Sequence, residues 1–181
     1  MSAPAGGAVC RTEDRERVRI ITLDRPGALN AFDDALYDAV RDALDEAARR
    51  DDVAVALITG AGRAFSAGQD LSELDTPPQY DDGARHGFTP FMETVESFPK
   101  PLVAAVNGLA VGIGVTLLPH CDLVLVARGA RLRAPFVRLG VTTEAGSSLL
   151  LPARMGWQHT AHLLYTASWI DAEQAVASGL A

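Results

Sequence analysis

The feature that most constrains the fold is an apolar stretch interrupted by three glycines. It runs from Leu102 to Leu118 and reads LVAAVNGLAVGIGVTLL. Its first part has the apolar composition of a buried strand, and its last part has that of a buried helix. Because glycine destabilises a helix by about 1 kcal/mol relative to alanine, Gly108, Gly112 and Gly114 need a structural reason. We expect that another group approaches the backbone closely where the strand passes into the helix.

The composition narrows the class of protein. A chain of 181 residues suits one domain, and a hydrophobic content of 48% is enough for a sizeable core. The net charge of −7 argues against a general nucleic-acid surface. The N-terminus lacks the basic start and apolar core of a secretory signal, and no segment has the roughly 20 uninterrupted apolar residues of a membrane span. We therefore expect a cytoplasmic protein with neither nucleic acid nor a membrane as partner.

Strands are predicted to alternate with helices along the chain. Apolar or β-branched runs predict strands over 18–23, 53–59, 102–107 and 122–127, of which 53–59 is expected to be fully buried. Apolar periodicity and capping signals predict helices over 31–50, 91–98, 149–165 and 171–179. This order is typical of an α/β fold with a mostly parallel sheet.

The remaining segments are expected to be loops or caps. Residues 1–16 are predicted to be a flexible leader, followed by a core over 17–181. The polar segment 72–90 is rich in Pro and Gly and is predicted to be a mobile loop, since loops of that length are often functional lids. Asn30 is the expected cap of the first helix.

Two strand–helix junctions could present free backbone N–H groups to one ligand. The first is the small-residue segment 60–71, where an N–H near Gln69 could point into a cleft. The second is Gly112-Ile113-Gly114, because the first N–H groups of a helix lack internal partners and carry the positive end of its dipole. Together they could bind a developing oxyanion. Alternatively the glycines only permit tight turns and close packing; a phosphate-binding loop is disfavoured, because neither G-x-G-x-x-G nor G-x-x-x-x-G-K-[ST] occurs there.

Several ordered motifs together resemble the crotonase, or enoyl-CoA hydratase/isomerase, superfamily. The matching stretches are ITLDRPGALNAF (21–32), ALITGAGRAFSAGQDL (56–71), KPLVAAVNGLAVGIG (100–114), CDLVLVA (121–127) and AEQAVASGLA (172–181). The resemblance implies a spiral of strand–strand–helix turns that binds acyl-coenzyme A thioesters in fatty acid metabolism. It implies no cofactor beyond the coenzyme A of the substrate. The C-terminal helical trimerisation region of such proteins is expected to be largely absent from this chain, and a homotrimer or dimer of trimers is expected if those helices are present.

The resemblance also assigns roles to individual residues. The backbone N–H groups of Gln69 and Ile113 match the oxyanion hole for the thioester carbonyl. The positions that match the substrate and coenzyme A path are Ala28, Ser66, Ala67, Gly68, Asp70, Leu71 and Gly112. Asp70 can equally cap or brace the following turn. The four histidines show no metal-ligand spacing, so no metal site is expected.

The residue types at three further positions select among the reactions of this superfamily. Its hydratases use two glutamates, and this chain has Thr116 and Phe136 at those positions. Neither can act as a carboxylate base, which argues against hydration. The segment around Glu144 instead looks like the peroxisomal-type Δ3,Δ2-enoyl-CoA isomerase branch, in which the matching glutamate is the catalytic base.

That branch implies one proton carrier. Glu144 would take a proton from C2 of a 3-enoyl-CoA and return it at C4, in an apolar acyl pocket that includes Phe136 and Leu139. Three alternatives stay open: Glu144 is a helix-start carboxylate, the chain is a hydratase-like or other crotonase-type enzyme, or it is a non-catalytic acyl-CoA-binding or assembly protein.

Overall fold

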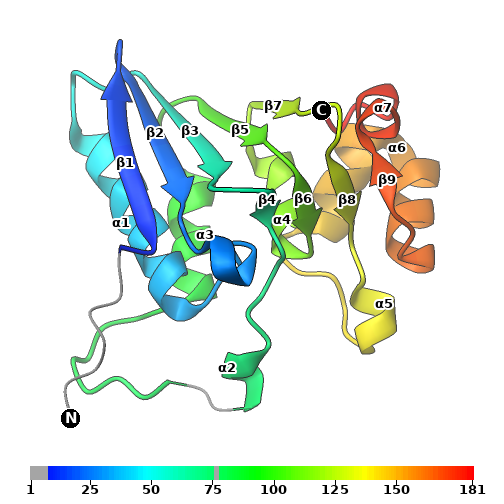
Figure 1. Cartoon of the computed structure of the whole chain (residues 1–181), viewed down its shortest axis with the longest axis horizontal. Helices are drawn as coiled ribbons and strands as arrows, with labels where there is room; N and C mark the ends of the chain where they lie inside the picture. Colours follow the sequence, from blue (N-terminus) through cyan, green and yellow to red (C-terminus); the bar gives the residue numbers. More distant parts are fainter. Residues whose placement is uncertain (1–7, 76–77) are drawn as a thin grey trace.

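The alternation expected from the sequence builds two β-sheets in the computed structural model, which describes residues 8–75 and 78–181 (Figure 1). One sheet has the strand order β1-β2-β3-β5-β7, and the other has the order β4-β6-β8-β9. The strands are β1 (Cys10–Arg15), β2 (Val18–Leu23), β3 (Val55–Gly60), β4 (Ala64–Ser66), β5 (Leu102–Val106), β6 (Leu109–Val111), β7 (Leu123–Val126), β8 (Arg131–Arg133) and β9 (Ile170–Asp171).

The helices connect successive pairs of strands. They are η1 (Pro26–Ala28), α1 (Asp34–Arg49), α2 (Ser72–Asp75), α3 (Phe88–Ser97), α4 (Ile113–Thr116), η2 (Leu118–His120), α5 (Phe136–Leu139), α6 (Ser147–Thr166) and α7 (Ala172–Ala177). Each pair β3–β4, β5–β6 and β7–β8 gives one strand to each sheet, and among these six strands the neighbours in each sheet are parallel. The chain therefore winds as a spiral of strand–strand–helix turns, and the expected α/β class is confirmed.

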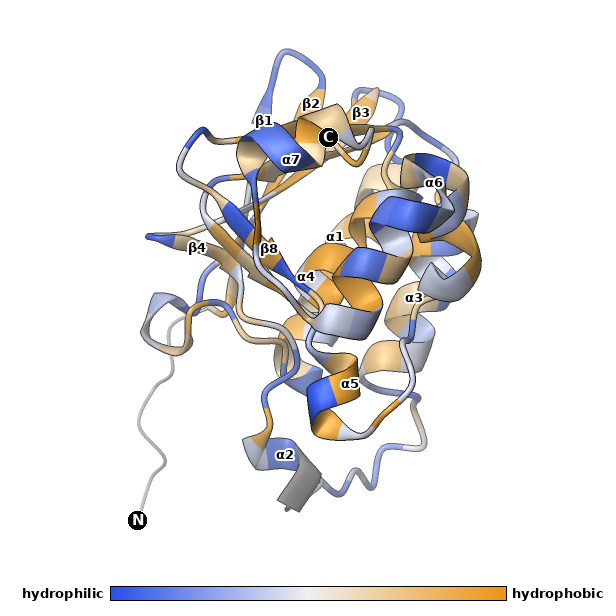
Figure 2. Cartoon of the chain, turned by 90° about the vertical axis from the view of Figure 1, so that its right-hand side faces the viewer, coloured by the Kyte–Doolittle hydropathy of each residue, from blue (hydrophilic) through white to orange (hydrophobic). Residues whose placement is uncertain are grey.

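Helices α1, α3, α4 and α6 lie together on one side of the sheets (Figure 2). The helix α1 buries an apolar face that includes Leu36, Val40 and Leu44, all with 0% exposure. In β3 only alternate residues are buried, so the expected full burial of 53–59 is wrong. The physical reason is that the helices cover one face of this sheet, which gives the period-two pattern of a strand with one open face.

Two expectations near the N-terminus are corrected. The predicted leader over 1–16 contains β1, which pairs antiparallel with β2 through the whole of Cys10–Arg15; residues 1–7 lie outside the described part. Asn30 does not cap α1: its side chain is buried and bonds to the backbone of residues 61 and 64. The cap is Asp33, whose carboxylate accepts from the Leu36 N–H at 2.8 Å.

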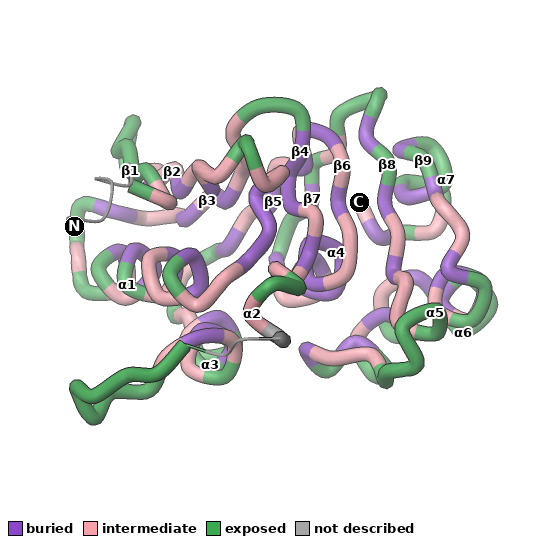
Figure 3. The backbone as a smooth tube through the Cα atoms, turned by 60° about the horizontal axis from the view of Figure 1, so that its bottom comes forward, coloured by how far each residue is buried: buried purple, intermediate pink, exposed green. Residues whose placement is uncertain are grey.

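The predicted loop over 72–90 contains α2 and the start of α3, and an exposed segment leads into α3 (Figure 3). The part of this segment over 80–87 contacts α1. The imidazole of His86 contacts the carboxylates of Asp38 in α1 and Asp82, and its ring stacks on Tyr80 with centroids 3.9 Å apart. The two carboxylates raise the pKa of His86. The Tyr80 hydroxyl donates to Asp34 Oδ2 at 3.2 Å, and the Gly87 N–H donates to Asp38 Oδ1 at 3.0 Å, so several contacts hold this segment against the first two turns of the helix.

Helix α6 is broken in its middle. Gly156 has φ 76° and ψ 160°, which are not helical values. The two halves of α6 therefore change direction there, and they border a pocket described below. No helix in the described part of the chain is long and apolar enough to cross a membrane.

Candidate functional site

The end of β4 presents one free backbone N–H. The Phe32 N–H donates to the Gly68 carbonyl oxygen at 2.7 Å, and the Asp70 N–H donates to the Phe32 carbonyl oxygen at 2.7 Å. This is an isolated parallel bridge between Phe32 and Gln69. Because successive peptide groups of an extended segment point to opposite sides, the Gln69 N–H points away from Phe32. It donates to no acceptor among the residues that the structure describes.

The end of β6 presents a second free N–H. Gly112 has φ 54° and is the N-cap of α4, and its carbonyl oxygen accepts from the N–H groups of Val115 and Thr116. Its own N–H donates to the Arg133 carbonyl oxygen at 3.0 Å. Ile113 is the first residue of α4, and its N–H donates to no acceptor in residues 8–75 and 78–181. The φ of Gly112 lies in the left-handed region, where glycine is the residue of least strain.

The glycines of the 102–118 stretch serve packing as well. A Cβ on Gly108 would lie 2.2 Å from the Arg63 carbonyl oxygen, and one on Gly114 would lie 2.9 Å from the Ser66 carbonyl oxygen. The group that approaches these two glycines is therefore the backbone at β4 and the residue before it. Close packing, the alternative reading of the glycines, is correct for both positions.

This packing brings the two free N–H groups to one edge. The strands β4 and β6 are parallel neighbours, so their carboxyl ends meet at the same edge of the sheet. A Cβ built on Gly112 would lie 3.7 Å from the Cα of Gly68, which shows that the two loop segments touch. The N–H groups of Gln69 and Ile113 follow these glycines directly. The pair has the arrangement of a candidate oxyanion hole, in which two donors serve one oxygen.

A carboxylate from the segment between α5 and α6 contacts α4, the helix that carries the Ile113 N–H. Glu144 Oε1 accepts from the Thr116 hydroxyl at 2.7 Å, and Glu144 Oε2 lies 3.2 Å from the same hydroxyl. Burial raises the pKa of Glu144, and the bond from Thr116 opposes this rise. The side chain does not cap α6, whose N-cap is Gly146 with no side-chain bond. Its hydrogen-bond partner lies in α4, so the alternative of a helix-start carboxylate would rest on the dipole of α6 alone.

Tyr37 also contacts the site, although it was not predicted from the sequence. Its ring is 1% exposed, and its hydroxyl donates to Gln69 Oε1 at 2.8 Å. Burial raises the pKa of Tyr37, and the charge of Glu144 raises it further. The only signal in the sequence is a residue with a polar tip on the apolar face of α1, beside Leu36 and Val40.

The residues expected along the coenzyme A path lie in or beside segment 66–71, which carries the Gln69 N–H. The Ala67 N–H donates to the Leu29 carbonyl oxygen at 2.9 Å, which ties this segment to the turn that holds Ala28. Ser66 is buried and its Oγ accepts from the Gly68 N–H at 3.1 Å. Leu71 is 52% exposed. These residues border the two free N–H groups from the β4 side.

Asp70 braces the turn after β4. Its carboxylate accepts from the hydroxyl of Ser72 and from Arg25 Nη2 at 3.0 Å. The bond from Ser72, followed by that from Arg25, holds the pKa of Asp70 below its ordinary value. Arg25 also pairs with Asp33 at 2.9 Å. A carboxylate fixed in this way supports the bracing role rather than a role in proton transfer.

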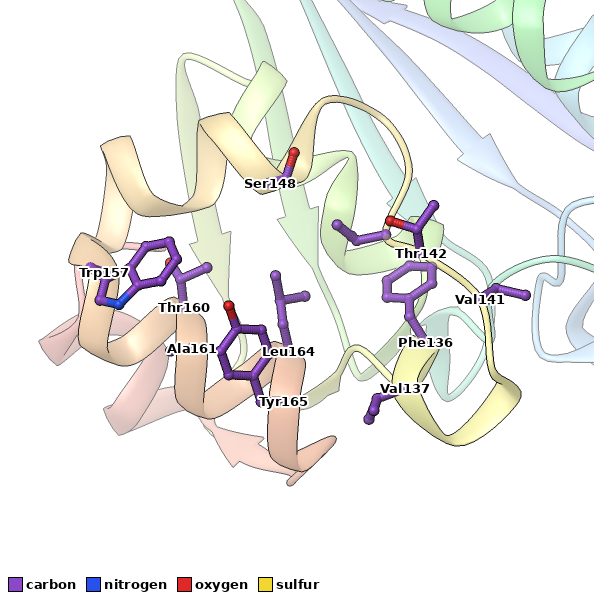
Figure 4. A pocket seen from close by; sticks show the side chains of 11 residues that line it. Phe136, Val137, Val141, Thr142, Ser148, Trp157, Thr160, Ala161, Leu164 and Tyr165 are labelled. Carbon is purple, nitrogen blue, oxygen red and sulfur yellow. The ribbon is translucent and has the colours of Figure 1, made fainter.

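A pocket of about 330 Å³ lies between α5 and the two halves of α6 (Figure 4). Phe136 lines it, whereas Leu139 is 55% exposed and does not, so the expected grouping of these two residues in one pocket is wrong. The reason is that α5 is one turn long and turns Leu139 outward. Glu144 does not line the pocket either, although its neighbour Thr143 does. The other residues that line the pocket are Val137, Val141, Thr142, Ser148, Trp157, Thr160, Ala161, Leu164 and Tyr165.

No group of three or more His, Cys, Asp or Glu side chains placed to hold a metal ion occurs in residues 8–75 and 78–181. The four histidines have other neighbours in the structure. The Nε2 of His120, for example, lies 2.8 Å from the Ala145 carbonyl oxygen. The groups of the site described above are two backbone N–H donors, the half-buried carboxylate of Glu144 with the Thr116 hydroxyl on it, and the Tyr37 hydroxyl on the Gln69 side chain.

Comparison with known proteins places this geometry among acyl-CoA enzymes. The chain is 36% identical over 163 residues to 1,2-epoxyphenylacetyl-CoA isomerase of Escherichia coli, covering 87% of this chain and 62% of that protein. It is 38% identical over 164 residues to enoyl-CoA delta isomerase 2 of Rattus norvegicus, covering 88% of this chain and 42% of that protein. The chain thus spans less than two thirds of the length of either relative.

The fold of the chain is also similar to those of solved structures. The crystal structure of an enoyl-CoA hydratase from Mycobacterium marinum superposes with a TM-score of 0.88 at 49% sequence identity, covering 95% of this chain and 81% of that one. The enoyl-CoA hydratase/isomerase family profile matches residues 13–181. The chain therefore shares its fold with this structure, and it belongs to the enoyl-CoA hydratase/isomerase family.

Proposed function

We propose that the protein isomerises 3-enoyl-CoA thioesters to trans-2-enoyl-CoA, with Glu144 as the only acid–base group. The observation that carries the proposal is the contact of the half-buried Glu144 carboxylate with the Thr116 hydroxyl at 2.7 Å. Thr116 lies in the helix that begins with the free N–H of Ile113. A base of this reaction must take a proton from carbon and return it. A carboxylate whose pKa is raised by burial is suited to both steps.

The reaction follows from these groups in two steps. Glu144 takes a proton from C2, the electron pair of that C–H bond forms a double bond between C1 and C2, and the carbonyl π pair moves to the thioester oxygen, while the C3–C4 double bond remains. The N–H groups of Gln69 and Ile113 stabilise the charge on that oxygen in the dienolate. Glu144 then returns the proton at C4, which leaves the double bond between C2 and C3. No water enters the product and the substrate loses no atom.

The residue types at the two hydratase positions support isomerisation over hydration. Water addition needs acid–base groups that activate a water molecule and protonate carbon. Thr116 instead uses its hydroxyl as a donor to Glu144, and Phe136 offers an apolar ring. Both side chains leave Glu144 as the one titratable carrier at these three positions.

A substrate comparison tests the proposal. The protein is mixed in separate reactions with a 3-enoyl-CoA and with the corresponding trans-2-enoyl-CoA, and conjugation and water addition are followed separately. We expect the 3-enoyl thioester to be converted and the 2-enoyl thioester to gain no water. Hydration of the 2-enoyl thioester would contradict the single-carboxylate mechanism and favour a hydratase-like enzyme. Binding of both thioesters without turnover would favour an acyl-CoA-binding protein.

We also propose a cytoplasmic location and, for a form of the protein that includes the C-terminal helices, a homotrimer or a dimer of trimers, in line with the resemblance. Light scattering of that form tests the assembly, since its mass should be three or six times that of one chain. A monomer of that form would contradict the proposed assembly. Cell fractionation with detection of the protein tests the location.

A further inference from the structure

A tyrosine and a phenylalanine of the first helical region hold the segment that carries one oxyanion donor. Phe32 bonds to the peptide groups on both sides of Gln69, through the Gly68 carbonyl oxygen and the Asp70 N–H. These bonds fix the two ends of the Gln69 residue. The side chain of Gln69 is held by a different group, because its Oε1 accepts from the Tyr37 hydroxyl at 2.8 Å.

The Tyr37 hydroxyl is itself held firmly. The ring is 1% exposed and stacks on Phe32, with centroids 4.7 Å apart and planes 28° apart. Phe91 lies against it at 5.2 Å, and Phe88 meets it edge-on at 5.8 Å. A ring packed on several sides by aromatic neighbours has little rotational freedom. Its hydroxyl therefore fixes the position of the side-chain amide that it contacts.

We infer that Tyr37 is a positioning residue, which aims the backbone N–H of Gln69 at the thioester oxygen by holding the Gln69 side chain. The inference rests on the proposed function, because it assigns the Gln69 N–H to the oxyanion hole. With Phe32 bonded on both sides and Tyr37 bonded to the side chain, the orientation of residue 69 is determined from three directions. A hole of preorganised donors stabilises a transition state because the donors need no reorganisation during the reaction.

The surroundings of Tyr37 keep its hydroxyl protonated, so that it remains a hydrogen-bond donor. Burial and the negative charge of Glu144 both raise the pKa of Tyr37, so the phenol stays protonated across the neutral range. The bond to Gln69 is then independent of the protonation state of Glu144. The oxyanion donor can remain in place in both halves of the proton transfer.

Tyr37→Phe tests the inference, because it removes the hydroxyl and keeps the ring stacking. The loss of one hydrogen bond that acts through another residue should lower kcat about 2- to 12-fold and leave KM within about twofold. The second readout is the infrared stretching frequency of the thioester carbonyl in bound trans-2-enoyl-CoA, labelled with 13C at that carbon. We expect binding to the unaltered protein to lower this frequency, and to lower it less in Tyr37→Phe. Tyr80→Phe is the matched control, since it also removes a donor hydroxyl, the one bonded to Asp34, and keeps a stacked ring, and Tyr80 does not line the pocket.

The carbonyl frequency separates this inference from the proposed function. If the protein binds the thioester but does not isomerise, the proposed function fails, and the carbonyl comparison still decides the role of Tyr37. An unchanged frequency shift in Tyr37→Phe, or no shift in the unaltered protein, would overturn the inference. A double-mutant comparison adds a further check: the Tyr37→Phe effect should disappear in a Gln69→Ala background, and its persistence there would also overturn the inference. If Tyr37→Phe does not fold, Gln69→Leu removes the acceptor instead, and it should give the same partial loss of the carbonyl shift.

Discussion

Gly114 holds the two candidate oxyanion donors together, and its replacement by alanine should separate them. A Cβ at this position would lie 2.9 Å from the Ser66 carbonyl oxygen and 3.2 Å from the Ser66 Cβ. Both neighbours belong to β4, and the main-chain oxygen cannot turn away as a flexible side chain could. The start of α4, which carries the Ile113 N–H, must therefore move away from the strand that leads to Gln69.

The size of the movement follows from the contact. Ordinary contacts begin at 3.4 Å, so a distance of 2.9 Å requires a shift of about 0.5 Å. A shift of this size between two donors should lower kcat/KM about 10- to 100-fold. Overpacking costs about 1–3 kcal/mol of stability, and alanine regains about 1 kcal/mol in helix propensity. The variant should therefore be destabilised by about 0–2 kcal/mol and remain folded at 25 °C.

The assay measures kcat/KM for 3-enoyl-CoA isomerisation together with the free energy of unfolding in urea. Gly129→Ala is the control, because a Cβ at Gly129 would meet nothing within 4 Å. We expect Gly129→Ala to retain full activity. A Gly114→Ala variant that is as active as the unaltered protein would show that the spacing of β4 and α4 does not set the rate, and would refute this account of the glycine.

Two further predictions concern pH. Because the Thr116 hydroxyl opposes the rise in the pKa of Glu144, Thr116→Val should move the acid limb of the pH–rate profile to higher pH. The control Thr116→Ser keeps a hydroxyl and should leave the acid limb in place. An unmoved acid limb in Thr116→Val would contradict the role of the bond. The pKa of His86 is raised by Asp38 and Asp82, so its contribution to stability is fully present below pH 6.5 and is lost as pH rises through the raised value. Thermal unfolding should therefore show a midpoint that falls over this range in the unaltered protein and falls less in His86→Asn, and parallel curves for the two proteins would count against the contact.

The longer elements could be predicted from sequence because their signal is local. The β-branched run at 18–23 and the periodic face of α1 each need no knowledge of distant residues. The strands β4, β6 and β8 have three residues each, too few for a periodic pattern, and they are defined by pairing with one another. The cap of α1 was misassigned for a similar reason. Asn30 and Asp33 are both good caps, and only the buried bonds of Asn30 to residues 61 and 64 decide between them.

In the candidate site, too, the features with a local sequence signal could be predicted and those set by distant contacts could not. Glycine spacing indicated the backbone N–H groups of Gln69 and Ile113, because the glycines mark where the backbone is exposed or closely packed, whereas Glu144 was indicated by the resemblance alone. The pairing of Tyr37 with Gln69 joins residues 32 positions apart, and it depends on how α1 lies against the end of β4. Leu139 was misplaced because the direction of a side chain on a one-turn helix is not set by its neighbours in sequence.

The central claim is that one carboxylate carries the proton, and Glu144→Gln tests it most directly. Glutamine keeps the size of the side chain and can still contact the Thr116 hydroxyl, but it cannot accept the proton from C2. We predict that isomerisation of 3-enoyl-CoA falls on the order of 100- to 10,000-fold, with little change in acyl-CoA binding. The control Glu173→Gln, at an exposed position of α7, should be fully active. Isomerisation by Glu144→Gln at the rate of the unaltered protein would contradict the account.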